Sequence, residues 1–260
     1  MEVVIVESVA ELGSIVADAI ESLLERTPDA VLGLATGSSP VPVYDELLAR
    51  FARGRISFGR ARAFLLDEYV GLPHGHPESY RSVIERSFTR RVDFAPGAVM
   101  GPDGNACDLT AACAAYESAI ASAGGVDLQL HGVGADGHIG FNEPGSSLGS
   151  RTRLKTLTSQ TRVDNARFFE SKDNVPRHVL TQGVGTILDA RHLVLVASGS
   201  GKAEPVAKVV EGPVTAMVPG SALQLHPHVT VVLDEVAASA LALSDYYRET
   251  WAAKPPWQGL

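Results

Sequence analysis

The sequence has few cysteines and no excess of basic residues, and each shortage excludes a class of protein. Its two cysteines, Cys107 and Cys113, form neither a disulfide framework nor a zinc-binding pattern, which favours a reducing compartment. The formal net charge of −8 argues against a nucleic-acid or anionic-membrane partner. It leaves room for a small anionic substrate, because a phosphate needs only a few local donors.

Long apolar runs are also missing. No stretch approaches the roughly 18 consecutive apolar residues that a membrane-spanning helix needs. The first residues, "MEVVIVESVAELG", lack the basic and long apolar regions of a signal peptide. We therefore expect a cytoplasmic protein.

Short apolar runs alternate with helical patterns along the chain. The runs, which predict strands, cover residues 3–6, 30–35, 63–66, 126–134, 192–199 and 229–234. Apolar spacings of three and four predict helices over residues 12–24, 41–51, 108–123, 202–212 and 235–249. Strands made almost wholly of Val, Leu and Ile are typical of a parallel sheet buried on both faces.

This alternation predicts a three-layer α/β fold, with a mainly parallel, Rossmann-like sheet and helices on both faces. Since no linker, repeat or low-complexity tract interrupts it, we expect a single domain over residues 1–260. In such sheets, ligands bind beyond the carboxyl ends of the strands. Polar residues from four separate segments follow apolar runs and should meet at that edge: Thr36, Asp67, Asp136 and Ser198.

Two strand–turn–helix segments could bind an anion. In "LATGSSP", a turn of Thr36, Gly37, Ser38 and Ser39 precedes a helix that opens at Pro40. The first N–H groups of a helix attract anions, although Ser38 or Ser39 could simply cap the helix. In "ASGSGKAEP", Lys202 lies in the first helical turn, where a cation is unfavourable to the helix dipole. That position favours a functional role for Lys202.

Two adjacent acids, Asp67 and Glu68, end the run at 63–66. Neighbouring residues in an extended chain point in opposite directions, so at most one of them can face a given pocket. Asp67 is the better candidate for the residue that faces the pocket. The alternative is that both acids simply form a polar end to the strand.

The segment "GVGADGHIGFNEPGSS", residues 132–147, is too rich in Gly and Pro for a regular helix. It brings Asp136 within two residues of His138 and holds Glu143 nearby. An acid, a histidine and a second acid suit a proton relay, in which a carboxylate fixes the imidazole tautomer. A metal site is a weaker alternative because no second His or Cys lies at ligand spacing. A serine hydrolase is also weaker, because no strand run leads into a Gly-x-Ser-x-Gly turn as a nucleophile elbow requires.

Five blocks of sequence together resemble the glucosamine-6-phosphate deaminase (isomerising) family. They are "LATGSSPVPVY", "LDEYVGLPHGHPESY", "GVGADGHIGFNEPGSSLGSRTRLKTLTSQTRVDNARFF", "GVGTILDARHLVLVASGSGKA" and "SALQLHPHVTVVLDE". They occur in the family's order between about residues 30 and 235. "FNEP" followed by "SRTR" is the most specific part.

The resemblance implies conversion of glucosamine 6-phosphate and water to fructose 6-phosphate and ammonia, without metal or organic cofactor. It implies that His138 shuttles a proton to open the sugar ring, with Asp136 orienting it and Glu143 completing the relay. Asp67 matches the base that moves a proton between C2 and C1. The substrate phosphate would be held by these residues: Thr36, Gly37, Ser38, Ser39, Arg167 and Lys202.

Family members of this length often form hexamers, and some are activated by N-acetylglucosamine 6-phosphate. The matching effector residues are Ser146, Arg153, Lys155, Thr156 and, near the C-terminus, Tyr246, with Tyr247 as the alternative. The resemblance also implies that residues 151–180 form a lid. Two other functions share parts of this pattern. A 6-phosphogluconolactonase would lack "FNEP", and a non-catalytic sugar-phosphate sensor would carry a DNA-binding module.

Overall fold

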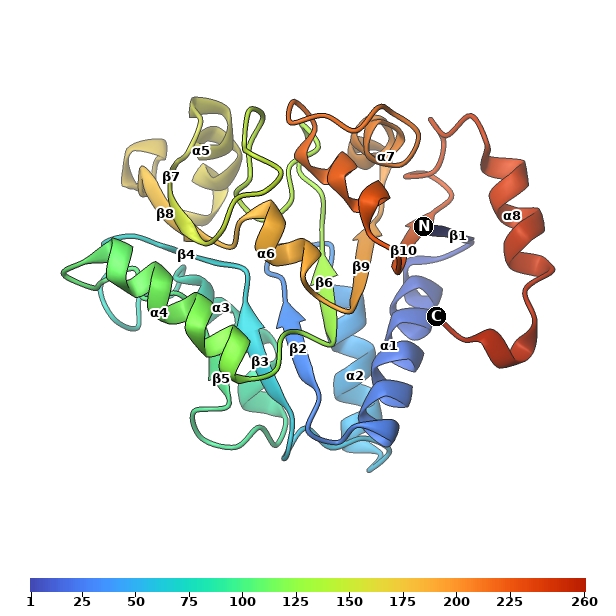
Figure 1. The fold of residues 1–260 in the computed structure, drawn as a ribbon, viewed down its shortest axis with the longest axis horizontal. Coiled ribbons are helices and arrows are strands. Elements are labelled where there is room, and N and C mark those ends of the chain that lie inside the picture. Colours follow the sequence, from blue (N-terminus) through green and yellow to red (C-terminus); the bar gives the residue numbers. More distant parts are fainter.

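The computed structural model describes residues 1–260, the side chain of Pro256 excepted, and it is built on one large parallel sheet (Figure 1). Its seven strands lie in the order β1-β10-β9-β6-β2-β3-β5, and each neighbouring pair is parallel. The strands are β1 (Glu2–Val6), β2 (Val31–Leu34), β3 (Arg62–Leu65), β5 (Val99–Met100), β6 (Leu128–His131), β9 (His192–Ala197) and β10 (Val229–Asp234). The six predicted strands are confirmed, and β5 is an additional one.

Helices cover both faces of this sheet, as the predicted three-layer fold requires. The α-helices are α1 (Val9–Arg26), α2 (Val41–Ala52), α3 (Tyr80–Ser87), α4 (Leu109–Ser122), α5 (Ser159–Asn165), α6 (Val184–Leu188), α7 (Ala203–Val210) and α8 (Ser244–Ala252). Short 3₁₀ turns are η1 (Thr89–Arg91), η2 (Ala166–Phe168), η3 (Lys172–Asn174), η4 (Ser200–Lys202), η5 (Pro219–Leu225) and η6 (Pro256–Gln258). Helices α1, α2 and α3 pack into the core on one face, and α4, α6 and α7 into the core on the other.

Helix α1 illustrates why these segments fold locally as they do. The Ser8 side chain accepts a hydrogen bond from the Glu11 N–H and so caps the first turn. Leu12, Val16 and Ile20 then recur at helical spacing and are buried against the sheet. Burying an aliphatic side chain of this size contributes about 1.5–3 kcal/mol. No helix among the described residues is long and apolar enough to cross a membrane.

A second, smaller sheet lies beyond the carboxyl ends of β2 and β3 (Figure 1). Its three antiparallel strands, in spatial order, are β4 (Asp67–Tyr69), β8 (His178–Thr181) and β7 (Arg153–Thr156). The chain passes directly from β3 into β4, and α5, η2 and η3 connect β7 to β8. The small sheet was not predicted, and it holds the segment expected to be a lid.

The predicted closing helix over 235–249 is wrong in its first half. Residues 235–242 form turns, and the helix, α8, begins only at Ser244. Two carboxylates hold these turns by accepting backbone hydrogen bonds: Asp234 from Ala237 N, and Glu211 from Ala242 N and Leu243 N. Those N–H groups bond side chains instead of the carbonyls of a preceding helical turn.

Candidate active site

A cavity of about 620 Å³ opens at the carboxyl end of the large sheet. We call it the Asp67 cavity. Its wall includes the turn after β2, the start of β4, the 132–141 loop, the α5–η2 segment and Lys202 of η4. Of the predicted catalytic and phosphate-binding residues, those that line it directly are Thr36, Gly37, Ser38, Ser39, Asp67, His138, Arg167 and Lys202.

Asp67 is the first residue of β4 and pairs with Thr181 of β8. Its side chain is buried, with only 7% of the residue exposed, and no hydrogen bond from a described residue reaches the carboxylate. Burial, reinforced by the neighbouring charge of Glu68, raises the pKa of Asp67 to about 8. A carboxyl group with such a pKa is a stronger base than usual once it has lost its proton.

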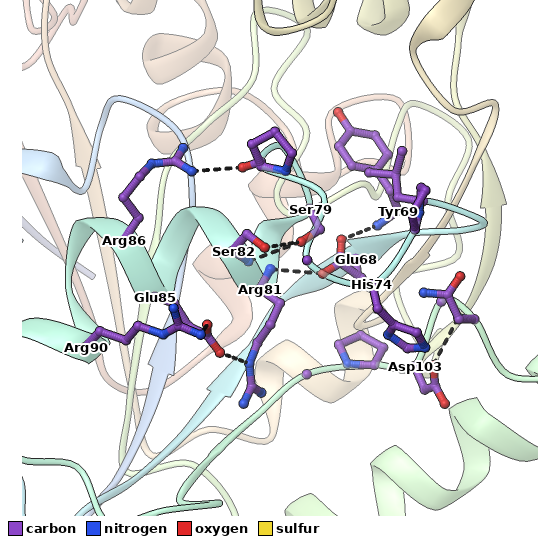
Figure 2. A pocket seen from close by; sticks show the side chains of 18 residues that line it. Glu68, Tyr69, His74, Ser79, Arg81, Ser82, Glu85, Arg86, Arg90 and Asp103 are labelled. Atoms are coloured by element: carbon purple, nitrogen blue, oxygen red, sulfur yellow. Dashed lines mark hydrogen bonds and ion pairs between the residues drawn. The ribbon is translucent and has the colours of Figure 1, made fainter.

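Glu68 points to the opposite side of β4, as expected for adjacent residues of a strand. Its carboxylate accepts hydrogen bonds from the backbone N–H groups of Tyr69, Tyr80 and Arg81, at 2.8, 2.9 and 2.9 Å (Figure 2). The last two belong to the first turn of α3, where a negative charge is favourable. Both oxygens of the Glu68 carboxylate therefore accept hydrogen bonds, whereas the Asp67 carboxylate accepts none from a described residue.

Asp136 and His138 form the pair that the sequence predicted. Asp136 Oδ1 lies 2.6 Å from His138 Nδ1 and also accepts a hydrogen bond from the His138 N–H. Partial burial raises the pKa of Asp136, but its interactions with His138 outweigh that effect, and the net shift is downward. The imidazole thus lies with Nδ1 against the Asp136 carboxylate, and its other nitrogen, Nε2, is left for exchange with a ligand.

Glycines in the same loop are required by this arrangement. A Cβ on Gly134 would lie 2.2 Å from His138 Cε1, so the imidazole packs directly over a glycine backbone. Gly137 has a φ of +85°, which favours glycine. The unusual glycine content of residues 132–147 thereby places the histidine.

Glu143 contacts other partners than His138. It is only 3% exposed, and its carboxylate accepts hydrogen bonds from the Thr158 N–H and, at 2.6 Å, from the Thr161 hydroxyl. These groups form the start of α5, with Thr158 as its N-cap. Glu143 thus links the loop of the Asp136–His138 pair to the segment that carries Arg167.

The residues predicted to bind the substrate phosphate all line the Asp67 cavity. Lys202 Nζ donates a hydrogen bond to the Val133 carbonyl at 2.6 Å. Burial lowers the pKa of Lys202, and the nearby charge of Arg167 lowers it further. Gly37, with a φ of +94°, forms the bend of the Thr36–Ser39 turn. The expectation that Ser38 or Ser39 caps α2 is wrong, because Pro40 occupies the N-cap position without a side-chain bond and the serines belong to the preceding turn.

Aromatic residues that the sequence reasoning missed form another wall. Tyr69 stacks on Tyr80 with ring centroids 4.8 Å apart, and Phe141 and Phe169 lie beside them. Asn165 donates a hydrogen bond to the Tyr69 hydroxyl. These residues come from four separate segments, so no local pattern in the sequence could have grouped them.

The predicted effector residues divide into two places. Arg153, Lys155 and Thr156 lie on β7, at the left of Figure 1, whereas Tyr246 lies on α8, at the right. Ser146 Oγ and Arg153 Nη2 are buried and have no hydrogen-bond partner among the described residues. Burial also lowers the pKa of Arg153. Within one chain the structure therefore does not bring Tyr246 to the other four.

A second cavity, of about 760 Å³, lies on the Glu68 side of β4 (Figure 2). We call it the Glu68 cavity. Its acidic side chains are bonded: Glu85 pairs with Arg81 and with Arg90, and Asp103 accepts a hydrogen bond from the Asn105 N–H. Elsewhere among the described residues, no three His, Cys, Asp or Glu side chains are grouped so as to hold a metal ion.

The sequence of the chain is also similar to those of known proteins. Residues 6–232 match the family described as glucosamine-6-phosphate isomerases/6-phosphogluconolactonase. The chain is 66% identical to a glucosamine-6-phosphate deaminase of Mycolicibacterium smegmatis and 67% identical to one of Beutenbergia cavernae, over the full length of each.

Solved structures show the same fold. A structure described as a monomeric glucosamine-6-phosphate deaminase, "missing link of the NagB superfamily", superposes with a TM-score of 0.90 at 44% identity. It covers 92% of this chain and all of its own. A 6-phosphogluconolactonase from Trypanosoma cruzi superposes with a TM-score of 0.74 at 22% identity, covering 93% of this chain and 97% of its own, which is a likeness of fold alone.

Proposed function

The chain belongs to the glucosamine-6-phosphate isomerase/6-phosphogluconolactonase family, and from that premise we propose how its residues divide the work. It is an enzyme of the deaminase branch, since relatives at 60–67% identity over their full length are glucosamine-6-phosphate deaminases. The reaction converts glucosamine 6-phosphate and water to fructose 6-phosphate and ammonia. The assignment of these roles rests on one observation: the unpaired Asp67 carboxylate lies in the same cavity as His138, whose imidazole contacts Asp136.

Ring opening is the first step. His138 moves a proton to the ring oxygen, and Asp136 fixes its tautomer through Nδ1 and stabilises the charged imidazolium. Glu143, whose carboxylate bonds Thr158 and Thr161 and not His138, acts beside this relay as a positioning residue. Its hydrogen bonds to Thr158 and Thr161 support a coupling between the relay and α5.

Proton transfer between carbons is the second step. Asp67 removes the proton from C2 of the open chain and delivers it to C1 through an enolamine. The C2 imine that results is attacked by water, and the C2–N bond breaks with release of ammonia. The raised pKa of Asp67 supports this role, because the group can both accept and return a proton near neutral pH.

The phosphate is held at the far end by the Thr36–Ser39 turn, Arg167 and Lys202. Backbone N–H groups and charge-assisted hydrogen bonds are the donors that a phosphate prefers. Two cationic side chains thereby line this cavity of a protein whose net charge is −8.

The test is to measure both products from glucosamine 6-phosphate in buffer containing a metal chelator. Ammonia and fructose 6-phosphate should appear in equal amounts. Hydrolysis of 6-phosphogluconolactone in place of this reaction would assign the cavity to the other branch of the family. The lactone is therefore assayed in parallel.

We also propose a regulated oligomer, a hexamer activated by N-acetylglucosamine 6-phosphate. The unpartnered Ser146 Oγ and Arg153 Nη2 support an anion site that also includes Lys155 and Thr156. Tyr246 would complete it only from a neighbouring chain. Native mass and substrate saturation curves with and without the effector test this. A monomer with hyperbolic, unaffected kinetics would contradict it, and the structural relative described as monomeric makes the measurement necessary.

The reaction is proposed to take place in the cytoplasm. Cys107 and Cys113 are both free thiols, a state that suits a reducing compartment. Cell fractionation with an antibody to the chain would locate it.

A further inference from the structure

The α5–η2 wall of the Asp67 cavity carries an acidic residue as well as a basic one. Asp164 and Arg167 are three residues apart, and both line the cavity together with Lys202. Asp164 accepts one hydrogen bond, from Gln160 Nε2 at 2.9 Å, and no ion pair joins it to a described cation. Asp164 is an exposed residue, and its negative charge belongs to the same cavity wall as the two cations expected to bind an anionic substrate group.

The negative charge of Asp164 acts on Lys202, the lysine proposed to bind the phosphate. Burial lowers the pKa of Lys202 most, Arg167 lowers it further, and Asp164 and Asp136 raise it. Asp164 is thus close enough to stabilise the ammonium group of Lys202 when the cavity is empty. A bound phosphate dianion would take over that role and would meet Asp164 as a like charge.

We propose that Asp164 sets the affinity of the Asp67 cavity for phosphate esters by repelling the phosphate that Arg167 and Lys202 attract. It weakens the binding of substrate and product alike, and it speeds the departure of fructose 6-phosphate. The inference rests on the phosphate role proposed above for Arg167 and Lys202. Arg167 and Lys202 promote phosphate binding, and the inference adds a residue that opposes it.

The experiment measures the inhibition constants of inorganic phosphate and fructose 6-phosphate in Asp164→Asn, with the wild type beside it. Removing the charge should tighten both by about three- to tenfold at low ionic strength, the range for a charge several ångströms from a dianion near the surface. The difference should shrink towards nothing near 1 M salt, where the screening length is about 3 Å. The KM for glucosamine 6-phosphate should fall with them.

Asp173→Asn is the matched control, because it removes the same charge from an exposed residue of the same connection between β7 and β8, but from a site outside the cavity. It should change none of these constants. Lys202→Ala separates the two hypotheses. If it weakens phosphate binding while Asp164→Asn changes nothing, the inference about Asp164 is overturned and the phosphate site stands. If Lys202→Ala leaves phosphate binding unchanged, the phosphate site itself is wrong and the inference fails with it.

Discussion

Two cavities flank strand β4, and they differ in what their carboxylates touch. The Glu68 cavity is the larger, at about 760 Å³ against about 620 Å³ for the Asp67 cavity. In the larger one Glu68 and Glu85 are bonded by backbone N–H groups or arginines. In the smaller one Asp67 has no hydrogen bond and Asp164 no ion pair among the described residues. Bonded charges hold a structure together, whereas an unpaired charge is available to a ligand, so volume alone does not identify the active cavity.

Asp67→Asn should have the largest effect. Turnover should fall by at least about 10²–10⁴-fold, the contribution of a well-placed general base, because an amide cannot take the C2 proton. Substrate binding should be nearly unchanged, as the phosphate contacts remain. Steady-state kinetics and equilibrium binding measure the two separately. Turnover like that of the wild type would remove Asp67 from the mechanism.

His138→Gln should have the next largest effect, and a selective one. Reaction from the closed ring should slow by about 10²-fold or more, since the group that protonates the ring oxygen is lost. An open-chain analogue bypasses that step and should be affected much less. Equal losses with both compounds would contradict a role in ring opening.

Lys202→Ala should mainly raise KM. A charge-assisted hydrogen bond to phosphate contributes about 1.5–3 kcal/mol, which corresponds to roughly 10- to 150-fold in affinity. The kcat should change far less, because Lys202 lies away from C1 and C2 in the proposed binding mode. An unchanged KM would exclude Lys202 from the phosphate site.

Glu68→Gln tests whether the two sides of β4 communicate. Because Asp67 must be ionised to act, kcat/KM should rise with pH through its pKa of about 8. The Glu68 charge contributes to that pKa, so its removal should move the rise to lower pH, by less than the effect of burial. The pH profile of kcat/KM measures this. Glu85→Gln is the control, since Glu85 lies in the Glu68 cavity and does not contribute to the Asp67 pKa.

Arg90→Ala should have the smallest effect. Arg90 lines the Glu68 cavity, its side chain is 77% exposed, and it pairs with Glu85. A surface substitution of this kind changes the free energy of unfolding by about 0.5 kcal/mol or less. Turnover and KM should be those of the wild type within about twofold. A large loss of activity would show that the Glu68 cavity takes part in the reaction.

The sequence pattern predicts most strands of the large sheet, but it does not predict the small sheet. The strands of the large sheet are buried on both faces, so their Val, Leu and Ile runs are visible in the sequence. Strand β7, "RLKT", is half exposed, and β4, "DEY", has three residues and two acids. Such short polar segments become strands through pairing with β8, which local patterns do not contain.

In the candidate site, too, the sequence predicts some contacts and misses others. The predicted Asp136–His138 contact joins residues two apart, and short spacing limits how far they can separate. Glu143 is only five residues beyond His138, yet its partners are Thr158 and Thr161, in a segment whose packing the sequence does not reveal. Motifs identify which residue types are present, and tertiary packing decides which of them meet.

The isolation of Asp67 also has a thermodynamic consequence. Its pKa in the folded chain, about 8, lies above the ordinary value of 3.8, so folding favours the neutral carboxyl. The stability that the neutral form contributes is complete below about pH 3.8 and is lost as the pH rises through 8. The ionised form needed for proton transfer is therefore the form that the fold tolerates least. Each turnover begins from this less stable form, and the burial that disfavours the ionised carboxylate also increases its affinity for the C2 proton.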